Sequence, residues 1–169
     1  MLLFIRKWVP IIVCLLLAAC ANSPVSMDEI KKLSFQVFLP EILPDGFTEQ
    51  KRVLDLTEES LFISYMNHDK YMELLQVKKP KYDYHPMIEW YANKDNRKKS
   101  DDRFEIVGNY VVGIDDSSNK QGVLEAVFLP KQDLDNQASY NELRYYHLQT
   151  NSNEEADWKT FIENLSPVN

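Results

Sequence analysis

Histidine and carboxylate side chains come first, because their spacing decides whether the chain can hold a metal ion. The sequence contains three histidines, His68, His85 and His147. The only local acid–histidine pairs are His68-Asp69 and Asp83-x-His85. A zinc site needs three or four ligands that converge on the ion, and neither pair has strong ligand spacing. We therefore predict no metal site and no cofactor.

Nucleophiles and paired carboxylates give no stronger indication of catalysis. Ser60, Ser64 and Ser100 lack the strand–turn–helix motif that exposes a catalytic hydroxyl. Polar acidic runs are mostly solvated turns, and those of this chain are Glu58-Glu59, Asp101-Asp102 and Asp115-Asp116. We therefore predict that the chain is not an enzyme, and a hydrolase with an unrecognised site is the least favoured alternative.

A basic and aromatic stretch from Lys78 to Arg103 is the strongest candidate for a binding site on this acidic chain. Cations interleaved with aromatic rings could hold an anionic envelope polymer or a sugar. The alternative is a solvated loop above a core that Trp90 holds, since charge runs usually face solvent. The candidate anionic-ligand patch consists of Lys79, Lys81, Tyr82, Tyr84, Trp90, Lys98 and Lys99.

The N-terminal segment has the organisation of an export signal. Arg6 and Lys7 precede an apolar run that is too short to span a bilayer. The run ends in Leu17-Ala18-Ala19-Cys20, which resembles the bacterial lipobox, where small residues precede a cysteine that becomes acylated. We predict that residues 1–19 form a lipoprotein signal peptide and that Cys20 is the lipidation site. The alternative is an uncut N-terminal helix, either membrane-anchoring or buried.

Lipidation predicts a location on the extracytoplasmic face of the cell membrane. Two or three acyl chains hold a protein firmly, at about 0.8 kcal/mol per buried CH₂. We assign residues 20–27 to a lipidated tether and residues 28–169 to a single globular domain. The stretch 21–26 reaches about 13 Å on average and about 20 Å when extended, so we expect the domain close above the membrane. Cys14 leaves with the leader, so no disulfide can form within the mature chain.

Composition is typical of a folded domain, with 44% hydrophobic and 27% charged residues in a chain of 169. The formal net charge of −7 becomes −9 once Arg6 and Lys7 are removed, because 17 basic and 26 acidic residues remain. This acidic balance argues against nucleic-acid binding, which requires a basic face. It also argues against general electrostatic adhesion to anionic lipid.

Hydrophobic periodicity predicts short helices and antiparallel strands along the mature chain. A helix begins after Ser26 and carries Ile30 and Leu33 on one edge. Residues 43–47, Leu-Pro-Asp-Gly-Phe, specify a tight turn, and residues 67–70 form the tip of a hairpin. Strands are predicted at 35–39, 48–56, 61–66, 71–78, 104–107, 110–114, 122–129 and 140–149. A helical segment with a leading proline is predicted at 86–93, and a polar loop at 131–139.

The final helix has the clearest pattern. Ser152 and Glu155 have the spacing of a capping box, and Pro167 is predicted to end the helix. An apolar stripe at helical spacing is formed by Trp158, Phe161, Ile162 and Leu165. The expected fold is α+β, with a single twisted antiparallel sheet, the C-terminal helix packed on one face and a short N-terminal helix.

Two turn and core motifs begin a longer pattern that has a counterpart in a known family. They are Phe35-x-Val37-x-x-Pro40 and Leu43-Pro44-x-Gly46-Phe47, and they are followed by Val53, the Leu61-to-Val77 hairpin, Ile106-Val107-Gly108 and Trp158-to-Leu165. This order over residues 33–166 resembles a Bacillus-type extracytoplasmic domain of unknown function. That domain occurs in lipoproteins and in the outer regions of anti-sigma-factor-like membrane proteins. The resemblance implies an envelope-facing domain of binding or sensory kind and supplies no catalytic residues.

Together these features favour a membrane-anchored envelope lipoprotein that acts as a non-enzymatic binding module for a partner protein or a cell-wall component. Its expected partners are the membrane, through the anchor at Cys20, and an envelope protein or an anionic wall polymer. The alternative is an extracytoplasmic sensor or regulatory domain that modulates a membrane signalling protein.

Overall fold

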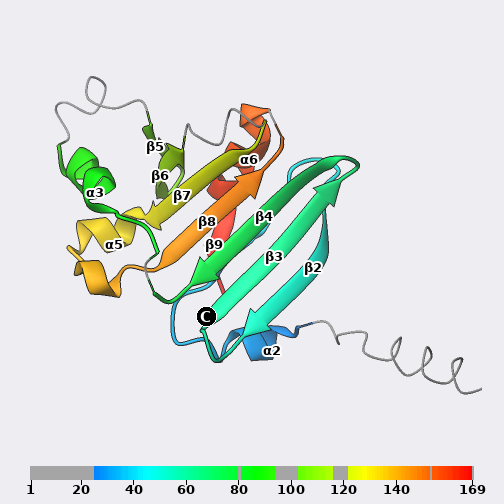
Figure 1. Ribbon diagram of the computed structural model, residues 1–169, viewed down its shortest axis with the longest axis horizontal. Helices are drawn as coiled ribbons and strands as arrows, with labels where there is room; N and C mark the ends of the chain where they lie inside the picture. The colour runs from blue at the N-terminus through cyan, green and yellow to red at the C-terminus, as the bar shows by residue number, and fades with distance from the viewer. Residues whose placement is uncertain (1–24, 80, 94–102, 116–121, 153, 169) are drawn as a thin grey trace, which may run out of the picture.

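The computed structural model describes residues 25–79, 81–93, 103–115, 122–152 and 154–168 (Figure 1). The predicted signal peptide at 1–19, the lipidation site Cys20 and the patch lysines Lys98 and Lys99 therefore lie outside the described residues. Strands predominate in the described ranges and the helices between them are short. The α+β class predicted from the sequence is confirmed.

Seven of the described strands form one antiparallel sheet in the order β2-β3-β4-β8-β7-β6-β5 (Figure 1). Consecutive strands pair with each other except at the centre, where β8 lies between β4 and β7. The chain therefore builds two three-stranded meanders, and β8 joins them into one sheet. The bounds are β2 Thr48–Asp55, β3 Ser60–Asn67, β4 Lys70–Val77, β5 Phe104–Val107, β6 Tyr110–Asp115, β7 Leu124–Pro130 and β8 Tyr145–Thr150.

The helical elements lie between and beside these strands. Phe161 of α6 contacts Tyr65 of β3 edge-on, with ring centroids 5.2 Å apart. Ile30 of α2 is fully buried in the same core cluster as Phe161, so α2 and α6 contribute to one core. The bounds are α2 Met27–Ile30, α3 His85–Ala92, α5 Lys131–Asp135, the 3₁₀ turn η3 Tyr140–Glu142 and α6 Glu155–Glu163.

A second, two-stranded sheet departs from the predicted single sheet, so that detail of the prediction is wrong. Strand β1, Phe38–Pro40, pairs antiparallel with β9, Leu165–Pro167. The final helix therefore ends at Glu163 and does not continue to Pro167. The physical reason is that pairing with β1 supplies partners for the backbone where the helix leaves its carbonyls open. The Glu41 N–H, for example, donates to the Asn164 carbonyl at 2.9 Å.

The two halves of the large sheet are buried differently. In β3 and β4 alternate residues such as Ile63 and Leu74 enter the main core, and the residues between them range from buried Val77 to exposed Met66. In β7 Phe128 enters the main core while Val127 and Leu129 enter a second cluster on the other face. Sheets covered on both faces show continuous apolar runs, whereas one-sided sheets alternate. The burial of β3 alternates, as in a sheet covered on one face, whereas the sequence of β7 contains a continuous apolar run, as in a sheet covered on both faces.

A buried glutamine connects the small sheet to the large one. Gln76 of β4 has no solvent exposure. Its Oε1 accepts the Phe38 N–H at 2.9 Å, and its Nε2 donates to the Phe38 carbonyl at 2.8 Å. The Gln76 carboxamide thus makes the two backbone hydrogen bonds that a neighbouring strand would otherwise make with β1. Because buried backbone groups without partners are costly, this side chain holds β1, and through β1 also β9, against the large sheet.

Several local predictions are confirmed. Ser26 caps α2 in a capping box with Glu29. The Phe47 N–H donates to the Pro44 carbonyl at 3.1 Å, and Gly46 has a φ of +79°, so the predicted tight turn forms. A Cβ on Gly46 would lie 2.7 Å from Asn67 Nδ2, so another residue there would displace the Asn67 side chain. The hairpin at residues 67–70 and the helical segment near 86–93 also form as predicted.

Three local predictions are wrong. Residues 131–139 contain the helix α5, because the segment that follows Pro130 forms a short helix from Lys131 to Asp135. Residues 140–144 are not strand, and β8 begins at Tyr145. Ser152 does not cap α6, because the helix begins later, after Glu154. Its hydroxyl donates instead to Asp157 Oδ2 at 2.6 Å.

We predict that Gln76→Leu lowers the free energy of unfolding by about 2–5 kcal/mol, since it leaves a buried N–H and a buried carbonyl of Phe38 without partners. Urea denaturation of the purified variant measures this loss. The control is Gln149→Leu, on a partly exposed position of β8, which should change the free energy by less than about 0.5 kcal/mol. Equal effects of the two substitutions would contradict the bridging role.

Candidate functional site

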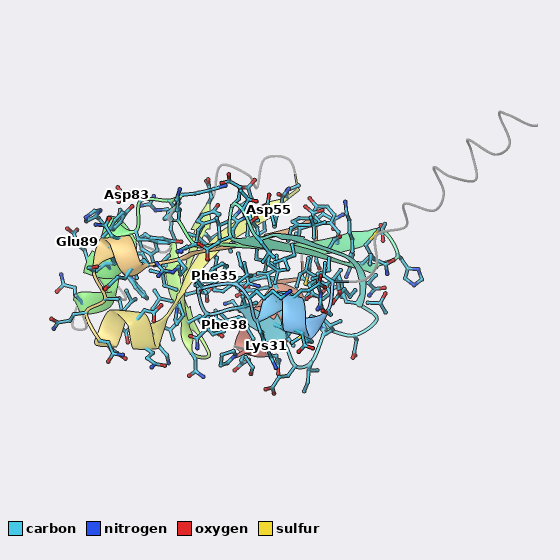
Figure 2. The ribbon with its side chains drawn as sticks, turned by 90° about the horizontal axis from the view of Figure 1, so that it is seen from below. Lys31, Phe35, Phe38, Asp55, Asp83 and Glu89 are labelled. Atoms are coloured by element: carbon cyan, nitrogen blue, oxygen red, sulfur yellow. The ribbon has the colours of Figure 1, made fainter. Side chains whose placement is uncertain are left out.

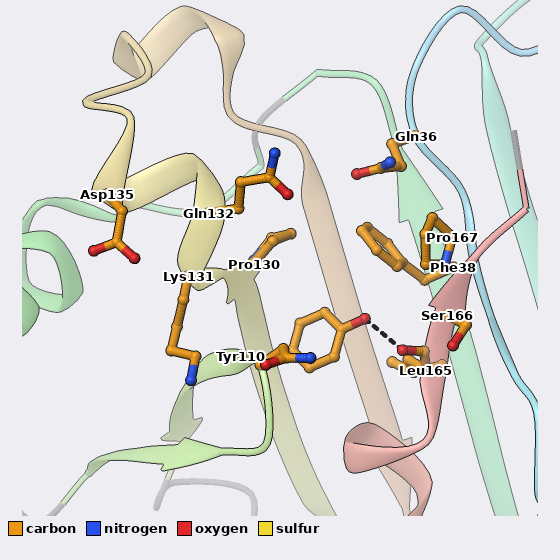
Figure 3. A pocket seen from close by; sticks show the side chains of 11 residues that line it. Gln36, Phe38, Tyr110, Pro130, Lys131, Gln132, Asp135, Leu165, Ser166 and Pro167 are labelled. Carbon is orange, nitrogen blue, oxygen red and sulfur yellow. Dashed lines mark hydrogen bonds between the residues drawn. The ribbon is translucent and has the colours of Figure 1, made fainter.

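A pocket among the described residues lies where the β1–β9 sheet meets the end of β7 and the start of α5. Its volume is about 510 Å³, which is in the range of small-ligand sites. Figure 3 shows Gln36 and Phe38 on one side of the pocket, with Gln132 and Pro130 on the other. The lining residues are Gln36, Phe38, Asn109, Tyr110, Pro130, Lys131, Gln132, Asp135, Leu165, Ser166 and Pro167.

Non-local contacts hold the walls of this pocket. The Tyr110 hydroxyl of β6 donates to the Leu165 carbonyl of β9 at 2.8 Å, which joins the two sheets across the pocket floor (Figure 3). Burial raises the pKa of Tyr110 above its usual value, so this phenol stays a donor at physiological pH. On the opposite wall, the Lys131 N–H donates to the Asn109 carbonyl at 2.9 Å and positions the start of α5.

The chemical character of the pocket is an apolar floor with a polar rim. Phe38, Tyr110 and Leu165 on the floor are buried. The rim carries neutral amides and a hydroxyl, together with Lys131 and Asp135 of opposite charge. The Asp135 carboxylate accepts the Tyr91 hydroxyl at 2.9 Å. Such a lining suits a ligand with hydrogen-bonding groups and an apolar part but little net charge.

The exposed side of β9 does not favour recognition by strand addition. The Leu165 carbonyl already accepts a hydrogen bond from Tyr110, and Pro167 has no N–H to offer an incoming strand. The side chains of the rim are therefore the groups available for recognition.

Several residues of this pocket lie in segments whose structure differs from the sequence prediction. Residues 131–139 were predicted as a polar loop, whereas a proline followed by Lys131 and Asp135 at helical spacing could have indicated α5. No local sequence pattern indicates that Ser166 lines the pocket, because its position depends on the pairing of β9 with a strand from the other end of the domain.

A smaller cavity of about 60 Å³ surrounds His147 on the other face of the sheet. The His147 Nε2 lies 3.5 Å from Glu125 Oε2, and the imidazole stacks on Tyr145 with centroids 5.7 Å apart. Burial lowers the pKa of His147, and the nearby Glu125 carboxylate opposes this shift only in part. Burial also raises the pKa of Tyr145. Tyr82 and Asp115 complete the polar lining.

The predicted anionic-ligand patch is only partly a surface. Tyr84 is fully buried and donates its hydroxyl to the Arg144 carbonyl at 3.0 Å. Trp90 is buried on α3 beside Phe104, with ring centroids 5.9 Å apart. Both rings therefore belong to the second core cluster, in agreement with the alternative of a loop above a core held by Trp90.

The remaining described members of the patch do reach the surface. Lys79 and Lys81 are exposed, and Tyr82 is half-buried with its carbonyl accepting the Tyr140 hydroxyl at 2.8 Å. Lys98 and Lys99 lie outside the described residues, so the role of the patch in binding an anion stays a prediction.

The acid–histidine pairs have local structural roles. His68 lies in the β3–β4 turn with a φ of +54°. The His85 Nδ1 lies 2.7 Å from Asp83 Oδ1, and its ring stacks on Tyr140. The hydrogen bond from His85 lowers the pKa of Asp83. Among the described residues, no three histidine, cysteine or acidic side chains gather closely enough to hold a metal ion.

The acidic pair Glu58-Glu59 lies in the turn between β2 and β3. The Glu59 carboxylate accepts hydrogen bonds from the Lys78 ammonium and from the Ser34 N–H. These bonds, chiefly the one from Lys78, lower the pKa of Glu59 to about 2. This carboxylate is therefore a structural acceptor that ties the turn to the end of β4.

We predict that the free energy of unfolding falls as the pH drops below about 6.5, because the unfolded chain then protonates His147 while the folded chain resists protonation. The stabilising effect is complete above that pH. His147→Gln should remove this part of the pH dependence, and His68→Gln, at an exposed turn, should keep it. Urea denaturation between pH 7.5 and 5.5, a range chosen around the ordinary histidine pKa of about 6.5, measures both. Parallel curves for the wild type and His147→Gln would contradict the assignment.

Comparison with known proteins identifies no relative of this chain. No family model matches the chain, and neither a curated protein nor a solved structure is similar to it. Within the described ranges, no helix is both long and apolar enough to cross a bilayer. The resemblance to a Bacillus-type extracytoplasmic domain stays a prediction.

Proposed function

We propose that the chain is a lipid-anchored extracytoplasmic binding domain without enzymatic activity, and that it holds an envelope protein or a cell-wall component. The pocket between the β1–β9 sheet, β7 and α5 is the observation that carries the binding part of this proposal. Its apolar floor and amide-rich rim provide many hydrogen-bonding groups and no pairing of nucleophile and base among its lining residues.

The anchoring part of the proposal rests on the sequence. Cys20 follows a lipobox-like tetrapeptide, and α2 begins only seven residues later, at Met27. A tether of seven residues reaches at most about 25 Å, so the domain stays near the headgroups. Two or three acyl chains outweigh the weak repulsion between an acidic domain and anionic lipid, which decays over a Debye length of about 8 Å.

We predict that Cys20→Ser moves the protein made in its native host from the membrane fraction to the soluble fraction, because the side-chain oxygen cannot form the thioether to lipid. Cys14→Ser, within the predicted leader, is the matched control and should leave the protein in the membrane. Fractionation and intact-mass spectrometry check both. An unprocessed N-terminus with a free Cys20 thiol in the wild type would contradict the anchor.

We predict that Ser166→Trp, which places an indole in the pocket, lowers retention of the chain on purified cell-wall material or on its envelope partner at least about tenfold. Thr57→Trp, in the exposed β2–β3 turn, is the control and should bind normally. Retention by co-sedimentation and by cross-linking measures the effect. A loss seen with Lys79→Ala/Lys81→Ala but not with Ser166→Trp would assign binding to the basic patch and overturn the pocket.

A further inference from the structure

The outward face of β2, β3 and β4 is a surface that carries apolar side chains, and no described helix or strand lies over it. We call this surface the open face and define it by Val53, Phe62, Met66, Tyr71 and Leu75. Val53, Phe62 and Leu75 form one row across three strands, and Met66 and Tyr71 form a second row, which Lys51, Ser64 and Glu73 separate from the first. Val53 is 40% exposed and Met66 is 41% exposed, and the other three are half-buried.

Side chains on the opposite face of the same strands pack into the main core. Ile63, Tyr65 and Leu74 are buried there. Figure 2, which views the molecule from below, places Lys31, Phe35 and Phe38 on one side of these strands and Asp55, an outward residue of β2, on the other. Within the described ranges, no helix or strand lies over the side that carries the open face (Figure 1).

The open face continues a layer that α3 covers elsewhere. Leu75 pairs with His147, and His147 pairs with Val127 in the next strand. Val127 is buried in the second core cluster together with Met87 and Trp90 of α3. The row that joins Val127, His147 and Leu75 therefore runs from a helix-covered half of the sheet to the open face, with the His147 imidazole between the apolar residues. Contiguous exposed apolar patches with a polar rim mark interaction sites.

The charged side chains around the open face indicate which charge a binding partner would carry. The neighbouring row across the sheet contains Glu73 of β4 and Glu125 of β7, and Asp55 lies at the end of β2. Lys51 is the one cation among the described outward residues of the strands β2–β4, β7 and β8. A second copy of the chain would set like charges opposite one another, which is unfavourable. A partner with cations around an apolar centre is complementary.

The edge of the sheet is a less suitable binding element than its face. Strand β2 forms this edge, and its pairing with β3 is interrupted by a bulge between Glu49 and Lys51. Charged side chains and bulges on an edge oppose the addition of another strand. We propose that the open face is a docking surface for an envelope-protein segment that presents apolar side chains flanked by lysine or arginine. The proposal deepens the binding function above and uses a surface separate from the pocket.

Photo-crosslinking of the full-length lipidated protein in its native host tests this proposal. A photoreactive phenylalanine analogue replaces Phe62, and a second protein carries it at the exposed position Ile42, outside the open face, as the control. We expect the Phe62 probe to label one protein segment that mass spectrometry identifies as apolar and rich in lysine or arginine, and we expect the Ile42 probe not to label it. Labelling of a second copy of this chain, of lipid, of an acidic segment or of nothing overturns the proposal.

Charge reversal and pocket blocking separate this proposal from the function proposed above. Glu73→Lys/Glu125→Lys should lower the Phe62 crosslink about fivefold or more, because it removes the complementary charges. The control Glu41→Lys/Glu163→Lys changes charge equally at exposed positions elsewhere and should leave the crosslink unchanged. Ser166→Trp should also leave it unchanged. A crosslink that disappears with Ser166→Trp but withstands the Glu73→Lys/Glu125→Lys change would assign the partner to the pocket and overturn docking on the open face.

Discussion

The carboxamide of Gln76 is the interaction on which the arrangement of this domain depends. A side chain from the middle of the large sheet satisfies both backbone groups of Phe38, so β1 can lie against the sheet without being one of its strands. Strand β9 pairs only with β1, and its position therefore depends on the same carboxamide. Because β9 and Phe38 form one wall of the pocket, this buried amide and the Tyr110–Leu165 hydrogen bond together set the geometry of the candidate site.

The two halves of the sheet differ in how their faces are packed. In β6 and β7 apolar residues on both faces are buried in the two core clusters. Strands β2 to β4 are covered on one face only, and their other face keeps apolar residues within an acidic surrounding. This division explains why a chain with an ordinary hydrophobic content still exposes Val53 and Met66.

Elements whose signals are local could be predicted from the sequence, and elements that depend on distant partners could not. The turn at Gly46, the hairpin at residues 67–70 and the cap at Ser26 each depend on residues within a few positions of one another. The end of the last helix was misplaced because Leu165 fits a helical stripe as well as it fits a buried strand. Tyr84 and Trp90 resembled surface aromatics because nothing nearby in the sequence reveals that Arg144 and Phe104 meet them.

The pairing of β1 with β9 brings together the two ends of the folded domain. Contacts between such distant segments form late, because the cost of closing a long loop must be met before they contribute. A chain that is still being synthesised holds β1 without its partner. The candidate pocket is therefore completed only after Leu165–Pro167 has been made and has paired with β1.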